Sequence, residues 1–416
     1  MSDNQMRNRF VSLRCTLCGA EFPLETQGTC ARCSGILTGH YDLKGKTFDL
    51  KYRGHSIWQY RDMMPPVSDS SIISMGEGWT PLVPARRYGA SIGADLWCKV
   101  EGENPSGSFK DRAASLGISL AESWHKTGVY TASSGNAAAA VSAYAARAGM
   151  DCIVLVREDS TPSKLGQIAM YGPRLLRVRD IFRTRQTLER AFNLMQSALP
   201  SWLNHFVWAP YNPLLIDGLK TVAYEIATEC SGNSLPDCIY VPTAGGDLLY
   251  GIFKVFQELR AAGVVERVPR MVVAQGLNAS PSVSAIESGS KVVPEIETAD
   301  TIAGALRVNF GAEHTLLAVR ESGGFGVAVS DEEIISAQRK IAAMDGIFTE
   351  VSSATALAAI AKSAAEGKIQ KDDRVLAILT GSGFKDYSPP FKDISSVPLA
   401  ESADQIPSIL ESKFGL

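Results

Sequence analysis

The segment Gly128-Val129-Tyr130-Thr131-Ala132-Ser133-Ser134-Gly135-Asn136, with the alanine-rich residues 137–147 that follow it, decides the fold of this 416-residue chain. Its first five residues are a largely apolar run, the next four favour a turn, and the alanine-rich stretch favours a helix. A strand that is apolar along its whole length is typical of parallel strands buried on both faces. The segment therefore predicts one strand–turn–helix unit of an α/β protein.

The same alternation recurs along most of the chain. We expect further strands over residues 95–100, 151–156, 237–241, 271–274 and 374–379. We expect helices that begin near Phe109 and that span residues 163–171 and 248–260. Repeated strand–helix units predict crossover connections and doubly wound parallel sheets.

Length and composition set the broad class. Hydrophobic residues make up 45% of the chain, charged residues 20%, and the formal net charge is -3. This composition gives no basic surface for nucleic acid or an anionic membrane, so we expect a small-molecule substrate. The chain has no apolar run long enough for a membrane span, no secretory signal and no disulfide framework, which together predict a cytoplasmic protein. A length of 416 residues predicts two lobes and a small appendage.

Four of the eight cysteines form two pairs, Cys15-Thr16-Leu17-Cys18 and Cys30-Ala31-Arg32-Cys33, with eleven residues between them. Two such knuckles present four thiolates in the tetrahedron that Zn²⁺ favours, and a closed four-thiolate site leaves no position for a substrate. The spacing predicts a structural zinc ribbon with Cys15, Cys18, Cys30 and Cys33 as ligands. Iron accepts the same ligands, and reduced surface pairs or a redox pair are the remaining interpretations.

A turn-rich segment, Glu103-Asn104-Pro105-Ser106-Gly107-Ser108-Phe109-Lys110-Asp111-Arg112, presents a lysine at the start of a predicted helix. The positive end of the helix dipole disfavours an ammonium, so it lowers the pKa of Lys110 and favours the neutral amine. A neutral amine attacks an aldehyde to form a Schiff base. The alternative is a solvated lysine, which is the commoner role of this residue type.

Six motifs in this order resemble the threonine synthase branch of the fold-type-II pyridoxal-phosphate enzymes, the group with the tryptophan synthase β-like fold. They are Gly76-Glu77-Gly78-Trp79-Thr80-Pro81-Leu82, the lysine segment, and residues 133–136, 212–221, 242–247 and 380–386. The cysteine ribbon is similar to an extension on some threonine synthases and cysteate synthases. The resemblance implies an α/β fold of two doubly wound parallel-sheet lobes preceded by the ribbon, a pyridoxal 5'-phosphate cofactor and a homodimer. It divides the chain into a ribbon (1–44), a large cofactor-binding lobe (45–112 and 218–416) and a small mobile lobe (113–217).

The resemblance also implies roles for individual residues. Lys110 binds the cofactor as a Schiff base and then moves protons on the substrate. Asn136 contacts the 3-hydroxyl of the cofactor, and Thr380 contacts its pyridine nitrogen. The cofactor phosphate lies on the turn formed by Ala244, Gly245, Gly246, Asp247 and Leu248, where backbone N–H groups and a helix dipole attract an anion. We expect the Asp247 side chain to point away from that phosphate or to cap the helix.

Ser133 and Ser134, in a strand–helix turn, are implied to bind the substrate carboxylate through backbone N–H groups. The implied reaction converts O-phosphohomoserine and water to threonine and phosphate. One departure concerns the substrate phosphate, because Leu215 stands where the family commonly has an arginine. Lys220 is then a candidate cation for substrate binding, as are Lys164 and Arg112. We expect Glu350 to have a structural role.

Three other functions stay open. The first is a β-replacement synthase of the cysteate type acting on O-phosphoserine, and the second is a serine or threonine dehydratase. The third is a cofactor-binding regulator without activity, which the presence of Lys110 argues against.

Overall fold

The computed structural model describes residues 8–43, 54, 56–160, 162–230, 235–370, 372–385 and 397–416. The chain divides into one unit that ends at Lys385 and a second unit from Asp386 to Leu416. The described part of the second unit carries the short helix α13 (Ile406–Ile409). Asp386, the last residue of the final motif, lies outside the described residues, as does the predicted boundary at residues 44–45.

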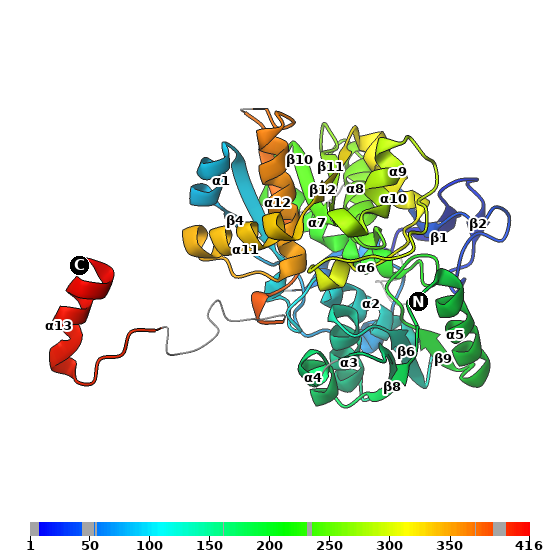
Figure 1. Ribbon diagram of the computed structural model, residues 1–416. Coiled ribbons are helices and arrows are strands. Elements are labelled where there is room, and N and C mark those ends of the chain that lie inside the picture. Colours follow the sequence, from blue (N-terminus) through cyan, green and yellow to red (C-terminus); the bar gives the residue numbers. More distant parts are fainter. Residues whose placement is uncertain are drawn as a thin grey trace. The chain divides into compact units, whose positions relative to one another are not determined.

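The larger sheet of the first unit has six strands in the order β12-β11-β10-β13-β5-β4 (Figure 1). All neighbours pair in parallel except β4 and β5, which pair antiparallel. The strands are β4 (Leu82–Pro84), β5 (Asp95–Val100), β10 (Cys238–Pro242), β11 (Arg270–Gly276), β12 (Phe325–Val329) and β13 (Arg374–Leu379).

A second sheet has four parallel strands in the order β8-β7-β6-β9. They are β6 (Gly128–Ala132), β7 (Asp151–Arg157), β8 (Arg174–Val178) and β9 (Trp202–Asn204). A third, antiparallel sheet in the order β2-β1-β3 forms the cysteine ribbon, from β1 (Phe10–Cys15), β2 (Glu21–Phe22) and β3 (Leu37–Tyr41).

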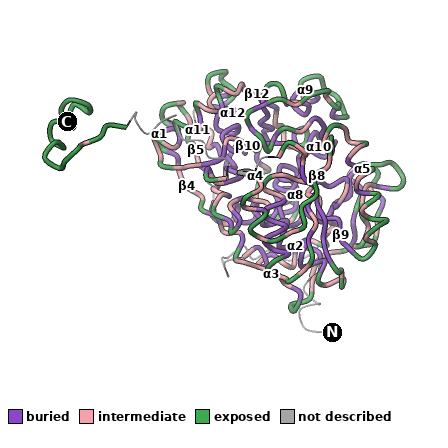
Figure 2. The backbone as a smooth tube through the Cα atoms, turned by 60° about the horizontal axis from the view of Figure 1, so that its bottom comes forward, coloured by how far each residue is buried: buried purple, intermediate pink, exposed green. Residues whose placement is uncertain are grey.

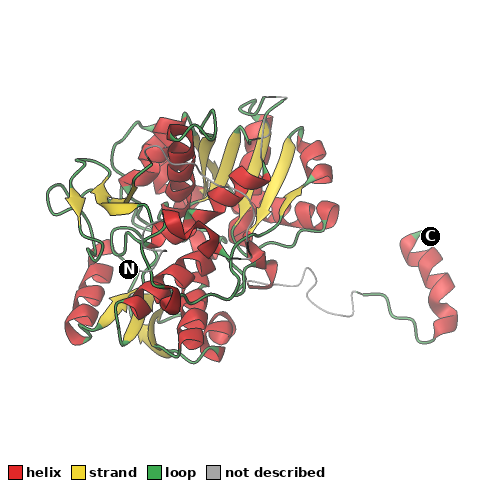
Figure 3. Cartoon of the chain, turned by 180° about the vertical axis from the view of Figure 1, so that it is seen from behind, coloured by secondary structure: helices red, strands yellow, loops and turns green. Residues whose placement is uncertain are grey.

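Helices connect these strands and cover both faces of the larger sheet (Figure 3). The helices of the first unit are α1 (Arg86–Ile92), α2 (Lys110–Ser123), α3 (Asn136–Ala148), α4 (Pro162–Met170), α5 (Arg185–Ala198), α6 (Leu215–Leu219), α7 (Thr221–Glu229), α8 (Asp247–Ala261), α9 (Pro281–Glu287), α10 (Glu313–Ser322), α11 (Asp331–Asp345) and α12 (Val351–Ala365). No described helix combines the length and the apolar character that crossing a lipid bilayer requires.

Successive residues of one strand belong to different hydrophobic clusters. Ile239 and Val241 of β10 pack with α8 and α10, whereas Cys238 and Tyr240 of the same strand pack with α11 and α12. Because neighbouring side chains of a strand point to opposite faces, both faces of this sheet are buried. Buried residues fill the inside of the first unit, and exposed residues lie on its outer helices and loops (Figure 2).

The structure confirms the predicted α/β class and the parallel sheets. The predicted strands at residues 95–100, 128–132 and 374–379 have the observed bounds, and the helices that begin at Lys110, Asn136 and Asp247 start within one residue of the prediction. Among the parallel strands, three were not predicted, namely β8, β9 and β12. β9 has only three residues, and β8 is largely exposed, so neither carries a long apolar signal.

A buried ion-pair network joins the lysine helix to the larger sheet. Arg112 of α2 is fully buried, and its guanidinium donates to Glu101 (Nε–Oε2 2.7 Å) and to Glu225 of α7 (Nη2–Oε2 2.8 Å). Lys99 of β5 lies 3.0 Å from Glu225. This network occupies Arg112, so the structure contradicts its candidacy as a free cation for the substrate.

Removing Arg112 should strongly destabilise the fold. In Arg112→Met, Glu101 loses its cation and Glu225 keeps only Lys99, and breaking a buried pair of this kind costs about 3–5 kcal/mol. Arg174→Met is the matched control, because Arg174 pairs with Asp151 on the surface, where such a change costs at most about 1 kcal/mol. Urea denaturation followed by tryptophan fluorescence measures both, and equal losses would contradict the assignment.

Candidate active site

The carboxyl ends of four parallel strands bring the predicted site residues together. The lysine segment follows β5, the Ser133–Asn136 turn follows β6, residues 243–246 follow β10, and Thr380 follows β13. In open α/β sheets, ligands bind in the crevice outside these strand ends. The ends belong to both parallel sheets, so the candidate site is built from both.

Backbone contacts fix the position of Lys110 at the start of α2. The amide of Phe109 donates to the carbonyl of Thr380 (3.0 Å), and Ser108 forms an antiparallel bridge with Gly381. The Lys110 ammonium lies 4.5 Å from the centroid of the Phe109 ring. The lysine and the end of β13 are therefore held against each other.

Burial lowers the pKa of Lys110 from 10.5 to about 8, although the carboxylates of Asp247 and Glu350 act in the opposite direction. The direction agrees with the one expected from the sequence, and the largest cause of the lowered pKa is loss of hydration on burial. With a pKa of about 8, about one amine in ten is neutral at pH 7. A neutral amine has the lone pair that a nucleophile or a base requires near neutral pH.

Glu350 connects two predicted cofactor ligands. Its carboxylate accepts hydrogen bonds from Asn136 Nδ2 (2.9 Å) and from Thr380 Oγ1 (3.0 Å). Ser353 Oγ lies 3.0 Å from the same Thr380 hydroxyl. Although Glu350 occupies the N-cap position of α12, its side chain makes no capping bond. The Glu350 carboxylate therefore holds the Asn136 and Thr380 side chains together and opposes the lowering of the Lys110 pKa, and its expected structural role stays a prediction.

The turn before α8 has the geometry of an anion-binding loop. Gly246 has a φ of +96°, and a methyl group on it would lie 1.7 Å from Thr315 Oγ1, so only glycine fits there. Within the described chain, the backbone N–H groups of residues 244–246 have no hydrogen-bond acceptor, and the buried Thr315 hydroxyl has no partner. These donors meet at a helix N-terminus, which suits a phosphate group.

The Asp247 carboxylate is buried and contacts residues outside this turn. Its Oδ1 accepts from the amide of Ala209 (3.2 Å) and lies 2.9 Å from Nε2 of the fully buried His314. It does not cap α8. His314 and Thr315 escaped the sequence analysis because they lie some seventy residues along the chain from the turn that they contact.

The turn of Ser133 and Ser134 precedes α3, as predicted, and some of its donors are occupied. The Ser133 amide donates to Leu155 (2.9 Å), and the Gly135 amide donates to Ser133 Oγ (3.2 Å). Ser134 Oγ accepts from Ser160 Oγ (2.7 Å). In the described chain, the amides of Ser134, Asn136 and Ala137 remain available to a carboxylate.

Lys220 is not brought to the other predicted site residues. Its side chain is fully buried, 2.6 Å from Asp217 Oδ1, and its ammonium lies 3.8 Å from the ring centroid of Tyr41 in the cysteine ribbon. Leu215 is fully buried too. The sequence could not show that Tyr41 of the ribbon covers Lys220. Lys164 is among the residues whose side chains are not described.

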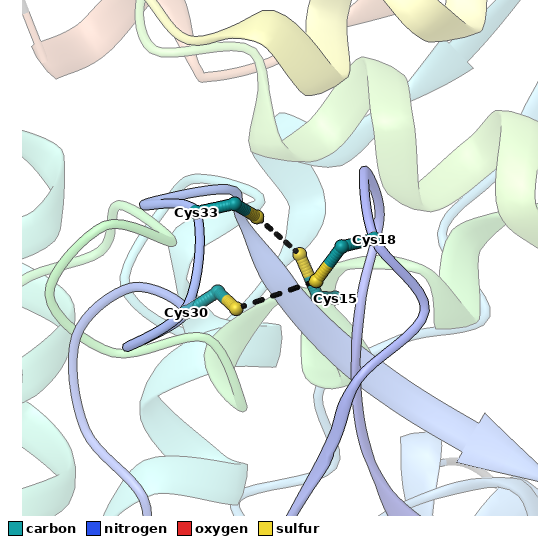
Figure 4. Close-up of side chains that lie close together, drawn as sticks. All are labelled: Cys15, Cys18, Cys30 and Cys33. Atoms are coloured by element: carbon teal, nitrogen blue, oxygen red, sulfur yellow. Dashed lines mark hydrogen bonds between the residues drawn. The ribbon is translucent and has the colours of Figure 1, made fainter.

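The four ribbon cysteines gather around one point (Figure 4). Their sulfurs lie within 4.8 Å of one another, with Cys15 and Cys33 3.5 Å apart and Cys18 and Cys30 3.6 Å apart. Four sulfurs bound tetrahedrally to Zn²⁺ at about 2.3 Å are about 3.8 Å apart. The residues present therefore fit a four-thiolate metal site.

Comparisons with known proteins agree with this geometry. Residues 73–381 match the model of the family described as pyridoxal-phosphate dependent enzyme. A threonine synthase of Methanocaldococcus jannaschii is 35% identical over 90% of this chain and 92% of its own length. A threonine synthase of Methanosarcina acetivorans is 34% identical over 97% and 98%.

Solved structures agree on the fold. A maize serine racemase superposes with a TM-score of 0.62 at 24% identity, over 73% of this chain and 88% of its own. A serine racemase from Dictyostelium discoideum superposes with a TM-score of 0.60 at 26% identity, over 73% and 92%. The chain therefore belongs to the pyridoxal-phosphate-dependent enzymes, as a threonine synthase-like lyase.

Proposed function

We propose that this chain converts O-phosphohomoserine and water to threonine and phosphate. The observation that carries the proposal is that Asn136 and Thr380 both donate a hydrogen bond to the Glu350 carboxylate. The same carboxylate acts to raise the pKa of Lys110. The similarity to threonine synthases over most of the chain supports the choice of reaction.

Lys110 would bind the aldehyde of the cofactor and, after the substrate amine displaces it, would hold and return protons on the substrate carbons. When bound, pyridoxal phosphate supplies the electron sink for this chemistry. The reaction moves several protons around one amine, so an amine with a pKa of about 8 is suited to both tasks.

Asn136 would donate to the 3-hydroxyl oxygen of the cofactor and Thr380 would contact its pyridine nitrogen. Glu350 positions both side chains by accepting a hydrogen bond from each. Thr380 has one hydroxyl proton, so it would turn this proton from Glu350 to the pyridine nitrogen. A neutral hydroxyl there does not enforce a protonated ring, which moderates the electron sink. The amides of Ala244, Gly245, Gly246, Asp247 and Leu248 would hold the cofactor phosphate.

The substrate carboxylate would lie on the amides of the Ser133 and Ser134 turn, at Ser134 and Asn136. For the substrate phosphate, Lys385 is a better candidate than Lys220. Its ammonium donates to the carbonyl of Ser106 in the lysine segment (2.7 Å) and to Gln167 Oε1 of α4 (2.6 Å). Two of its three N–H groups are thereby used, and among the described residues the third has no acceptor, so it is available to an anion.

A second function on the same scaffold is favoured by one observation. Leu215 is fully buried where the family commonly has a phosphate-binding arginine. A cysteate-type synthase acting on O-phosphoserine, or a serine or threonine dehydratase, is therefore the alternative.

The remaining proposals concern the assembly. We propose that the ribbon metal is zinc, because the sulfur spacing fits a Zn²⁺ tetrahedron. We also propose a cytoplasmic homodimer, with a large lobe (45–112 and 218–416) that binds the cofactor and a small lobe (113–217) that moves on substrate binding.

Covalent cofactor uptake should depend on pH through the Lys110 amine. The neutral amine is the nucleophile, so the rate of visible absorbance formation after mixing apoprotein with pyridoxal phosphate should rise with pH and level off above about 8. An ordinary lysine would show a rate that keeps rising toward pH 10.5. Stopped-flow absorbance measures the profile. Lys110→Ala, the control, should give no such band, and a profile without a bend near pH 8 would contradict the burial argument.

A substrate panel tests the proposed reaction. The holoenzyme is incubated with O-phosphohomoserine, O-phosphoserine plus sulfite, serine or threonine, and phosphate, amino-acid and keto-acid products are measured. Threonine and phosphate in equal amounts from O-phosphohomoserine are expected. If phosphate is released only from O-phosphoserine with sulfite, the chain is a cysteate-type synthase instead. If the only product is a keto acid from serine or threonine, it is a dehydratase.

A further inference from the structure

Two chains of contacting residues connect the cysteine ribbon to residues 244–248. These residues form the turn that is proposed to hold the cofactor phosphate, called the phosphate turn below. The first chain starts at the metal ligands. A methyl group on Gly35 would lie 2.8 Å from Cys15 Sγ, so the Gly35 backbone lies directly against a ligand sulfur. The next amide, that of Ile36, donates to Glu313 Oε1 (3.0 Å). One residue therefore separates the sulfur cluster from helix α10.

Three consecutive residues of α10 continue this chain. Glu313 accepts from the ribbon, His314 lies 2.9 Å from Asp247 Oδ1, and Thr315 packs against Gly246. His314 and Thr315 are fully buried, and the His314 ring also lies edge-on to Tyr250 of α8 at 5.3 Å. A shift of the first turn of α10 would consequently move both sides of the phosphate turn.

The second chain of residues reaches the same turn from a different residue of the ribbon, Gly28. The amide of Gly28, two residues before Cys30, donates to the carbonyl of Tyr211 (3.1 Å). The Tyr211 ring lies 5.7 Å from Trp208, and Trp208 Nε1 donates to the carbonyl of Gly245 (3.1 Å). Gly245 and Asp247 are thus each linked to the ribbon by a separate set of contacts.

A buried charged cluster fixes the ribbon on the catalytic unit. Tyr41, at the end of β3, is 4% exposed, and its ring lies 3.8 Å from the Lys220 ammonium and 4.9 Å from the Lys254 ammonium. Lys220 pairs with Asp217, and Lys254 pairs with Glu258. Lys254 belongs to α8, the helix that begins at Asp247 at the end of the phosphate turn. The ribbon therefore contacts the helix that follows this turn. The ribbon is therefore packed against the site rather than tethered to it.

We propose that the metal-loaded ribbon positions the cofactor-phosphate turn, so that metal binding and pyridoxal-phosphate binding strengthen each other. Metal–thiolate bonds hold the two knuckles at residues 15–18 and 30–33, and the amides that reach Tyr211 and Glu313 lie within three residues of these ligands. Glu313, which contacts neither ligand, is a positioning residue in this arrangement. Coupling of this kind is reciprocal for binding constants.

Equilibrium titrations test the coupling without any substrate. The zinc dissociation constant is measured by competition with a colorimetric chelator, for protein saturated with pyridoxal phosphate and for apoprotein, after free cofactor has been removed. The pyridoxal-phosphate constant is measured by fluorescence with and without zinc. We expect each ligand to tighten the other by the same factor, about fivefold or more. Unchanged constants would overturn the proposal and would leave the proposed reaction untouched.

A matched pair of variants locates the coupling at Glu313. Glu313→Gln keeps an acceptor oxygen for the Ile36 amide, whereas Glu313→Ala removes it. We expect the alanine variant to keep its zinc and its far-ultraviolet circular dichroism, to bind pyridoxal phosphate more weakly, and to lose most of the coupling factor. The glutamine variant should retain the coupling. If zinc removal unfolds the chain, the test uses the zinc-loaded proteins only. Zinc-loaded Glu313→Ala that binds pyridoxal phosphate as tightly as the wild type would contradict the proposal.

Discussion

The bond between the Phe109 amide and the Thr380 carbonyl is the constraint on which the site depends. It fastens the start of the lysine helix to the end of β13, so the nucleophile and a predicted cofactor ligand cannot move independently. The Ser108–Gly381 bridge and the buried Arg112 network reinforce this junction from the neighbouring residues. Loss of hydration at the junction lowers the pKa of Lys110 to about 8.

Two carboxylates influence Lys110, and two of the basic residues considered for the substrate are already paired in the described chain. Asp247 and Glu350 both act on the amine, yet each carboxylate is held by other partners, His314 in one case and Asn136 with Thr380 in the other. Arg112 and Lys220 are bound in buried ion pairs. Under the proposed function, a substrate phosphate would rely on backbone N–H groups and on Lys385, because Leu215 stands in place of an arginine.

Local signals made the fold predictable from the sequence. Apolar strands and turn-forming residues placed the helices that start at Lys110, Asn136 and Asp247, and cysteine spacing placed the ribbon ligands. Tertiary partners were not predictable, because nothing near Glu350 indicates Asn136, which lies 214 residues away in the chain. Lys220 was misjudged for the same reason, since its burial depends on Tyr41 from the ribbon.

The central claim is that one amine at the head of α2 carries the cofactor. Borohydride reduction of the holoenzyme, followed by proteolysis and mass spectrometry, tests this claim most directly. The account predicts that the reduced phosphopyridoxyl group is found on Lys110 and is absent from Lys110→Ala. Label on Lys220 or Lys385, or an unlabelled Lys110 in a protein that retains its visible absorbance, would contradict it.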